Sequence, residues 1–311
     1  MCEMGAVAFK INMMSPITPV DAGDDAVLER ALRWARAHGR TVAAHPESRD
    51  VVERLSLELR ESGRADVLAY AQAHSPESEL KAVDRILGIA LRAGARLHLC
   101  HVSSGRSVPL IARARRRGLQ VSCEATPHHL LLTVDDLVRV GAIAIVDPPL
   151  RDRGDRARLW DALAAGAIDV VASDHAPHAI REKVRDEVWD VSPGFPGLET
   201  ELPLLLTQVN KGALTLERLV DVFARNPSRI FGLTGKGELE RGYDADITIV
   251  DLKRRFTIDP SGFHSKAKYS PFEGMEVTGR PVKVLVGGRL VMDEGEILAK
   301  AGSATVLRRT R

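Results

Sequence analysis

The sequence predicts an α/β protein built on a parallel sheet, and three observations lead to this prediction. Short apolar runs of strand length alternate with longer amphipathic stretches. Hydrophobic residues make up 44% and charged residues 28% of the 311 residues, as in soluble globular proteins. From about Gly235 the pattern changes to short strand-like runs separated by Gly and Asp turns. Strand–helix alternation is typical of parallel sheets covered by helices.

The individual elements follow from this periodicity. Strands are predicted at 5–11, 41–45, 95–101, 119–125, 143–147 and 169–174. Helices are predicted at 24–38, 77–94, 105–118 and 153–165, with three more helical stretches between 199 and 232. We place a domain boundary after residue 234, which leaves a large α/β domain at 1–234 and a small β-rich domain at 235–311.

Charge and cysteine content narrow the class of protein. The net charge of +2 gives no sign of a nucleic-acid partner, and the basic run at 113–118 is interpreted as a solvated helix end. No apolar run is long enough to span a membrane. From the charge and the hydropathy together, neither a nucleic acid nor a membrane is predicted as a partner. Cys2, Cys100 and Cys123 form no CxxC pair, and the last two lie in strand-like runs. We expect reduced cysteines and a cytoplasmic protein.

Potential metal ligands collect at the ends of the predicted strands. Lys10, His45, His101 and Asp174 each stand at the end of a different strand. Right-handed crossovers put the carboxyl ends of parallel strands on one side, where active sites of (β/α) barrels form. Two His and one Asp suit zinc or a similar divalent ion. This pattern explains why the apolar run "DVVASDHAPH" ends in an acid and two histidines.

Each of these residues also has a structural interpretation. A single His at a strand end is often only hydrogen-bonded, and Asp174 could cap the following turn. Lys10 could extend its amine to water, or a desolvated amine could react with carbon dioxide to give an anionic carbamate that bridges two metals. His98 alternates with two leucines, and we interpret it as a structural residue that faces the helix layer.

Several motifs together resemble one family. They are "ASDHAPH" followed by Glu182 and Lys183, "CEATPHHLLLT", "HVSSGRS", "DPPLR" and "NPSRIFGL". In this order they are similar to the cyclic amidohydrolases of the metal-dependent amidohydrolase superfamily: dihydroorotase, allantoinase and dihydropyrimidinase (hydantoinase). The similarity runs through nearly the whole chain. "CEATPHH", "SDHAPH" and the loop "PGFPGLETELPLLLT" look most like dihydroorotase.

The resemblance implies a fold and a metal site. The fold would be a (β/α)8 TIM-type barrel with a β-sandwich, so that 1–234 is part of the barrel and 235–311 belongs to the β-rich domain. His45 and His101 would bind one Zn²⁺. Lys10 would be carboxylated and would bridge the two Zn²⁺ ions of the complete enzyme. Asp174 would bind the other ion.

The resemblance also implies a reaction. The metal site would activate a water for attack on a cyclic amide carbonyl, and Asp174 would carry the proton to the leaving nitrogen. His178 and backbone groups around Gly194 and Gly197 would hold the substrate. For dihydroorotase the reaction is the reversible hydrolysis of dihydroorotate to N-carbamoyl-aspartate in pyrimidine biosynthesis.

The sequence departs from the family pattern in two places. The HxH motif of the family's first barrel strand is absent from the printed sequence, so the barrel is predicted to be incomplete and to lack its first strands. We expect a fragment of a longer enzyme; the alternative is a natural truncated relative completed by a partner or by self-association. Asp147 of "DPPLR" stands where dihydroorotases often have Asn, and an acid there fits poorly beside an anionic substrate.

The predicted function is therefore zinc-dependent dihydroorotase activity on a small-molecule substrate, with homo-oligomer formation as a possibility. Allantoinase and dihydropyrimidinase are the alternatives within the class. A non-catalytic structural or regulatory relative is the alternative from another class. The four metal-site positions that the resemblance assigns, Lys10, His45, His101 and Asp174, all keep the residue type of the family, which favours an enzyme.

Overall fold

The computed structural model describes residues 1–14 and 20–307, which form two compact units. One unit consists of residues 8–197 and 260–271. The other consists of residues 1–7, 198–259 and those from 272 onward. The helices at 198–232 thus group with the C-terminal strands. The boundary after residue 234 is a different division of the chain and stays a prediction.

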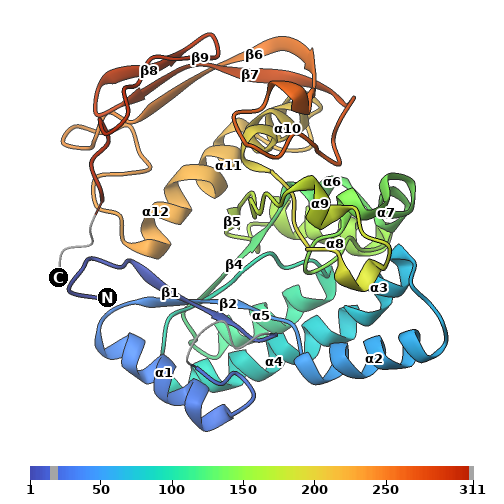
Figure 1. Ribbon diagram of the computed structural model, residues 1–311. Helices are drawn as coiled ribbons and strands as arrows, with labels where there is room; N and C mark the ends of the chain where they lie inside the picture. Colours follow the sequence, from blue (N-terminus) through green and yellow to red (C-terminus); the bar gives the residue numbers. More distant parts are fainter. Residues whose placement is uncertain (15–19, 308–311) are drawn as a thin grey trace. The chain divides into compact units, whose positions relative to one another are not determined.

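The larger unit contains a parallel sheet of five strands. They are β1 (Ala8–Asn12), β2 (Thr41–His45), β3 (Leu97–Leu99), β4 (Val121–Ala125) and β5 (Val170–Val171), paired in sequence order (Figure 1). The helices are α1 (Asp25–Ala37), α2 (Arg49–Glu61), α3 (Val67–Ala73), α4 (Pro76–Ala93), α5 (Val108–Arg116), α6 (Pro127–Leu131), α7 (Val134–Val140), α8 (Arg153–Ala164) and α9 (Ile180–Lys183). The prediction of a parallel α/β sheet is confirmed.

Local sequence signals explain the longest helix, α4. Ser75 caps its first turn through a bond to the Ser78 N–H, and Pro76 occupies the first helical position. Gly94 ends the helix at φ 62°, a left-handed conformation that glycine adopts without steric cost. The face that packs toward the sheet and α1 is apolar and buried: Ala82, Val83, Ile86, Ile89 and Ala90. Burial of this stripe holds α4 against the strands.

The strand register corrects one prediction. Lys10 is paired with Ala43, Ala43 with His98 and His98 with Ser122, so these residues share one face of the sheet. His98 therefore faces the same side as Lys10, and the prediction that it faces the helix layer is wrong. Its ring nitrogens lie 2.8 Å from Ser122 Oγ and 2.9 Å from Glu124 Oε2. The structural interpretation of His98 fits this pairing.

The apolar run at 143–147 does not form the predicted strand. Residues 141–144 form a 3₁₀ turn, and Ile145 continues as a buried, irregular segment. The Ile145 carbonyl accepts hydrogen bonds from Gly194 N–H and Lys183 Nζ instead of joining a ladder. The run was predicted as a strand because it is apolar, as buried strands are. Its backbone, however, bonds to groups from a distant loop and not to a neighbouring strand. Helices α2, α3, α6, α7 and α9 were not predicted.

The second unit combines three helices with an antiparallel sheet. The elements are α10 (Leu198–Asn210), α11 (Leu216–Val220), α12 (Asn226–Phe231), β6 (Ile247–Thr257), β7 (Glu276–Val286), β8 (Arg289–Asp293) and β9 (Glu296–Ile297). The strand order is β6-β7-β8-β9. A Gly287–Gly288 turn with both φ angles positive joins β7 to β8, as a two-residue hairpin requires. The prediction of a β-rich region with glycine turns beyond Gly235 agrees with this sheet, but β6 and β7, at 11 residues each, are longer than the short strands predicted.

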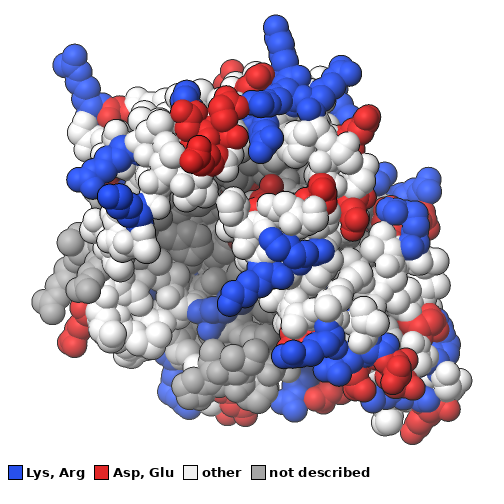
Figure 2. All heavy atoms as spheres, turned by 45° about the horizontal axis from the view of Figure 1, so that its top comes forward, with Lys and Arg blue, Asp and Glu red and all other residues white. Residues whose placement is uncertain are grey.

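The surface carries both charge signs. On the face drawn in Figure 2, basic and acidic side chains are both spread over the protein, in keeping with 44 Lys and Arg against 42 Asp and Glu. Within residues 1–14 and 20–307, no helix has the length and apolar character needed to cross a bilayer.

A matched pair of substitutions tests the core. Leu32 of α1 is fully buried, whereas Leu57 of α2 is 57% exposed. Leu32→Ala should lower the free energy of unfolding by about 2–5 kcal/mol, because it leaves a cavity between α1 and the sheet. Leu57→Ala should change it by less than about 0.5 kcal/mol. Urea unfolding followed by circular dichroism measures both, and equal effects would contradict the packing described.

Candidate metal centre and active site

The parallel sheet brings the four predicted metal-site residues to one edge. Lys10 lies in β1, His45 ends β2, His101 follows β3 by two residues and Asp174 follows β5 by three. His101 (φ 34°) and Asp174 (φ 46°) both have left-handed backbone conformations, which are uncommon outside glycine. Such conformations persist where the surrounding structure imposes them, and they cluster at functional sites.

His45 and His101 present two ring nitrogens to each other. The Nδ1 of His45 lies 3.1 Å from the Nε2 of His101, and both side chains are buried. A tetrahedral ion at about 2.1 Å from two nitrogens would separate them by roughly 3.4 Å, so this spacing is close to that of a shared metal. The Nδ1 of His101 is buried without a hydrogen-bond partner among the described residues.

Burial keeps the imidazole of His101 in the state that binds metal. Burial, helped by positive charge from His45 and Lys10, holds the pKa of His101 well below its usual range. A neutral ring offers a lone pair to a cation. On the His45 ring, Nε2 lies 2.7 Å from Glu47 Oε2, so an Nε2–H donated there leaves Nδ1 free as a ligand atom. The two residues fit a zinc ion.

Lys10 and Asp174 lie close to this pair. The positive charge of the Lys10 amine acts on Cys100, Glu124 and Asp174. Burial raises the pKa of Asp174 to about 6, although Lys10 opposes the change. Lys10, whose amine the resemblance assigns as carboxylated, thus lies near Asp174, which the resemblance assigns as the proton carrier.

A second set of potential ligands lies deeper in the sheet. His98, Cys100 and Glu124 offer ligand atoms within 4.8 Å of one another. His98 and Glu124 are already hydrogen-bonded at 2.9 Å, and Glu124 also accepts the His101 backbone N–H at 3.2 Å. This set is satisfied by its own contacts.

The loop that contains Gly194 and Gly197, which is predicted to hold substrate, is fixed by hydrogen bonds to neighbouring segments. The Gly194 N–H donates to the Ile145 carbonyl, and the Gly197 N–H donates to His175 Nδ1. A Cβ on Gly194 would lie 2.6 Å from the Ala176 Cβ, so glycine is required for this close approach. Both amide protons are engaged within the protein. The carbonyl groups of these glycines would therefore have to make any contact with the substrate.

His178 is held at both its backbone and its ring. The Tyr269 hydroxyl lies 3.2 Å from the His178 N–H and 3.0 Å from its carbonyl. The His178 Nε2 lies 2.9 Å from the Pro193 carbonyl, and Nδ1 lies 3.8 Å from Glu182. Its predicted substrate role stays a prediction; in the structure the ring ties the loop that contains Gly194 to the segment after β5.

Sequence reasoning missed two residues that organise these loops. Lys183 is fully buried, and its Nζ donates to the carbonyls of Ile145 and Ser192, both at 2.9 Å. The Nε2 of His129 lies 2.9 Å from the Pro148 carbonyl in "DPPLR". The signal was present, since Lys183 belongs to the quoted "EK" and His129 to "CEATPHH". Neither motif indicates by itself which distant carbonyl the side chain meets.

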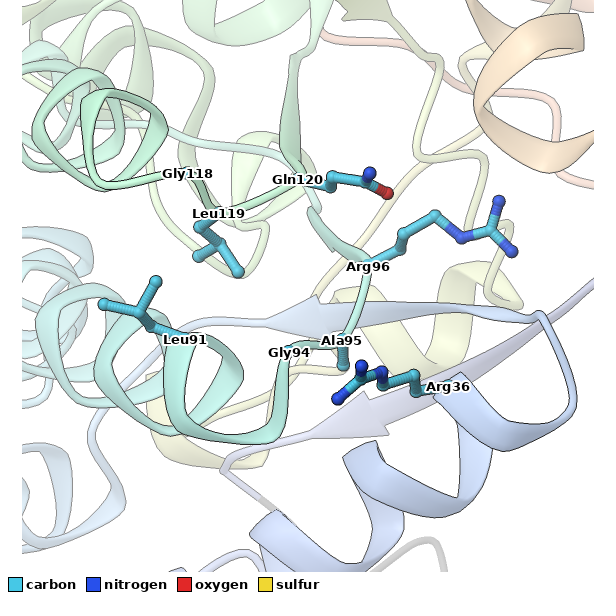
Figure 3. Close-up of a pocket in the computed structure, with 8 residues that line it drawn as sticks. All are labelled: Arg36, Leu91, Gly94, Ala95, Arg96, Gly118, Leu119 and Gln120. Atoms are coloured by element: carbon cyan, nitrogen blue, oxygen red, sulfur yellow. The ribbon is translucent and has the colours of Figure 1, made fainter.

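A cavity of about 340 Å³ lies elsewhere, at the amino-terminal ends of β3 and β4 (Figure 3). Arg36 donates to the Ala93 carbonyl at the end of α4, and Arg96 donates to the Gly39 carbonyl beyond α1. These arginines satisfy carbonyls at helix C-termini, where cations are favoured. The cavity is therefore structural, and the candidate site is at the opposite end of the strands.

Comparisons with known proteins agree with this fold. The model of the amidohydrolase family matches residues 1–291. The chain is 40% identical over 308 residues to an L-hydantoinase of Paenarthrobacter aurescens, covering 97% of the chain and 67% of that protein. It is 41% identical over 261 residues to a dihydroorotase of Methanothermobacter thermautotrophicus, covering 84% of the chain and 58% of that protein.

A solved structure shows the same fold. The L-hydantoinase (dihydropyrimidinase) of Arthrobacter aurescens superimposes with a TM-score of 0.95 at 38% identity, covering 99% of this chain and 69% of that one. The chain belongs to the amidohydrolase family, and its cyclic amidohydrolase relatives confirm both the resemblance and the predicted fold class. The chain spans about two thirds or less of the length of these relatives.

Lys183 gives a testable pH dependence. Burial lowers the pKa of Lys183 to about 7, against an ordinary value of 10.5. The folded state therefore binds fewer protons than the unfolded state between pH 7 and 10.5, so this lysine makes stability rise with pH in that window. Lys183→Met should lack this rise, and the wild type should gain up to about 4 kcal/mol relative to it from pH 7 to 10.5.

The control is Lys211→Met, which removes an exposed lysine. It should follow the wild-type stability at every pH. Urea unfolding from pH 7 to 10 measures all three proteins. A constant difference between the wild type and Lys183→Met across this range would contradict the burial of an uncharged amine.

Proposed function

We propose that this chain forms part of a zinc-dependent hydrolase of cyclic amides. The observation that carries the proposal is the pair of facing ring nitrogens on His45 and His101, 3.1 Å apart at the carboxyl ends of adjacent parallel strands. Lys10 and Asp174 lie at the same edge. A barrel edge with imidazole, amine and carboxylate groups suits metal-assisted hydrolysis of an amide.

Each residue has a distinct role in this proposal. His45 and His101 would hold one ion, a carboxylated Lys10 would bridge to a second, and Asp174 would bind that second ion. When bound, zinc supplies a Lewis acid and a water of lowered pKa. The Asp174 carboxylate would accept a proton and deliver it to the departing ring nitrogen. The loop from residue 192 to 197 would hold the ring against this carboxylate.

Dihydroorotate is the substrate we propose within this class, which would place the protein in pyrimidine biosynthesis. The support comes from "CEATPHH", "SDHAPH" and the Gly-rich loop, and from the similarity to a dihydroorotase. Asp147 is less adverse to an anionic substrate than its sequence position suggests. Its carboxylate accepts a hydrogen bond from Tyr70 at 2.5 Å and lies 3.5 Å from His74.

A second candidate is a hydantoin or dihydropyrimidine, with allantoin as a further cyclic ureide. The similarity to an L-hydantoinase covers 97% of the chain, more than the 84% covered by the dihydroorotase. An uncharged ring would also tolerate the Asp147 carboxylate. We further propose a cytoplasmic enzyme, because its cysteines are unpaired, and a homo-oligomer as its state in solution.

A substrate panel decides between these candidates. The HxH pair is not in this chain, so the assay uses a chimaera that carries the preceding segment of the M. thermautotrophicus dihydroorotase. Zinc-loaded protein is tested with dihydroorotate, hydantoin, dihydrouracil and allantoin. The highest kcat/KM is expected for dihydroorotate. Preference for hydantoin or dihydrouracil would replace the proposed substrate, and full zinc content without any turnover would favour the non-catalytic alternative.

The proton role of Asp174 is tested in the same chimaera. Asp174→Asn keeps the size of the side chain but removes the group that accepts the proton, so kcat should fall by about 10²–10⁴-fold. Substantial zinc should remain, because the two histidines still bind it. Asp161→Asn, an exposed change on α8, is the matched control and should leave kcat unchanged. Normal turnover of Asp174→Asn would exclude the proton role.

A further inference from the structure

A continuous line of buried polar groups runs from the metal-site histidine into the protein. His45 Nε2 lies 2.7 Å from Glu47 Oε2, and Glu47 Oε1 lies 3.0 Å from His74 Nδ1. His74 Nδ1 also lies 3.5 Å from Asp147 Oδ1, which accepts a 2.5 Å hydrogen bond from the Tyr70 hydroxyl. Glu47 is fully buried, and His45 and His74 are less than 10% exposed.

His74 lies between two acidic side chains, Glu47 and Asp147. Burial acts to lower the pKa of His74, but the charges of Asp147 and Glu47 outweigh burial and raise this pKa to about 9. The His74 ring is therefore cationic at neutral pH. A cation thus lies between two carboxyl groups, which offsets the cost of burying each charge.

The far end of the line is held firmly. Tyr70 and His74 lie four residues apart around α3, and their rings stack with centroids 4.7 Å apart. The Arg151 guanidinium donates to the His74 carbonyl and, at 2.9 Å, to Ser103 Oγ. Arg151 and Asp147 both belong to "DPPLR". The line therefore joins a metal-site histidine to a loop that follows it by about a hundred residues.

The hydrogen bond at Glu47 determines which nitrogen of His45 is available. A carboxylate can only accept, so the adjacent Nε2 must carry the proton in the neutral ring. The other nitrogen, Nδ1, then has the lone pair that faces His101. A ligand histidine whose second nitrogen is held by a carboxylate has a fixed tautomer and ring orientation, and loss of such a partner costs about 10–100-fold in metal affinity.

We propose that Glu47, with His74 and Asp147 behind it, is a positioning relay that fixes the tautomer and orientation of His45 for metal binding. The proposal rests on the metal role of His45 proposed above. The relay couples the metal site to "DPPLR", because Glu47 contacts both His45 and His74. Asp147 is then primarily a partner of His74 and Tyr70.

Glu47, His74 and Asp147 could instead hold a metal themselves, since their ligand atoms lie within 4.8 Å of one another. Three contacts favour the relay. The His74 Nδ1 that would have to bind a metal is within 3.0 Å of Glu47 and 3.5 Å of Asp147, as a shared N–H donor would be. Glu47 Oε2 is engaged by His45.

The test uses the full 311-residue chain and Co²⁺, titrated by its visible absorption. Glu47→Gln should weaken Co²⁺ binding by about 10–100-fold, and His74→Asn by a smaller factor in the same direction. Glu58→Gln, a surface change on α2 where Glu58 pairs with Arg54, is the matched control and should bind as the wild type does. His45→Ala should abolish the site.

The outcomes separate the relay from the metal site. Wild-type affinity in Glu47→Gln, with loss of binding in His45→Ala, would overturn the relay alone. Wild-type affinity in His45→Ala would overturn the metal role of His45 and the relay with it. Retention of one Co²⁺ in His45→Ala that His74→Asn then removes would show that the three residues are themselves the metal site.

A second measurement needs no variant that must fold. In metal-free wild-type protein labelled with ¹⁵N-histidine, long-range ¹H–¹⁵N spectra report which ring nitrogen is protonated. The relay predicts a protonated Nε2 and an unprotonated Nδ1 on His45. A His45 ring protonated at Nδ1 and unprotonated at Nε2 would overturn the proposal.

Discussion

The candidate site depends on the backbone hydrogen bonds that continue the parallel ladder beyond β3. The Cys100 N–H donates to the Ala44 carbonyl of β2 at 2.9 Å, and the Val102 N–H donates to the Glu124 carbonyl of β4 at 2.8 Å. His101 is thereby fixed between two strands, and its positive φ turns the ring toward His45. A parallel register that slipped by one residue would move His45 to the other face of the sheet and remove the pair.

Around this constraint, several buried charged side chains are paired with other polar groups. Glu47 lies between two imidazoles, Glu124 between His98 and a backbone N–H, and Lys183 between two carbonyls. Unpaired, each group would cost several kcal/mol. Paired, they order the loops, because the bonds from Glu47 to His74 and from Lys183 to Ile145 join segments far apart in the sequence. Chemistry at the strand ends thus relies on a rigid set of surrounding contacts.

The sequence predicted what local patterns encode. Short apolar runs located the five strands, and parallel topology then placed Lys10, His45, His101 and Asp174 at one edge. The strand at 143–147 was predicted wrongly, because an apolar run signals burial and not the identity of its backbone partners. The Glu47 relay was not predicted either. Its members are 27 and 73 residues apart along the chain, and neither spacing nor residue type shows that they meet.

The central claim is that His45 and His101 share one divalent ion. The most direct measurement is an anomalous difference map at the zinc edge from crystals of this chain grown with Zn²⁺. The account predicts a peak about 2.0–2.1 Å from both His45 Nδ1 and His101 Nε2. A map without a peak there, or with the ion bound only at Glu47, His74 and Asp147, would contradict it.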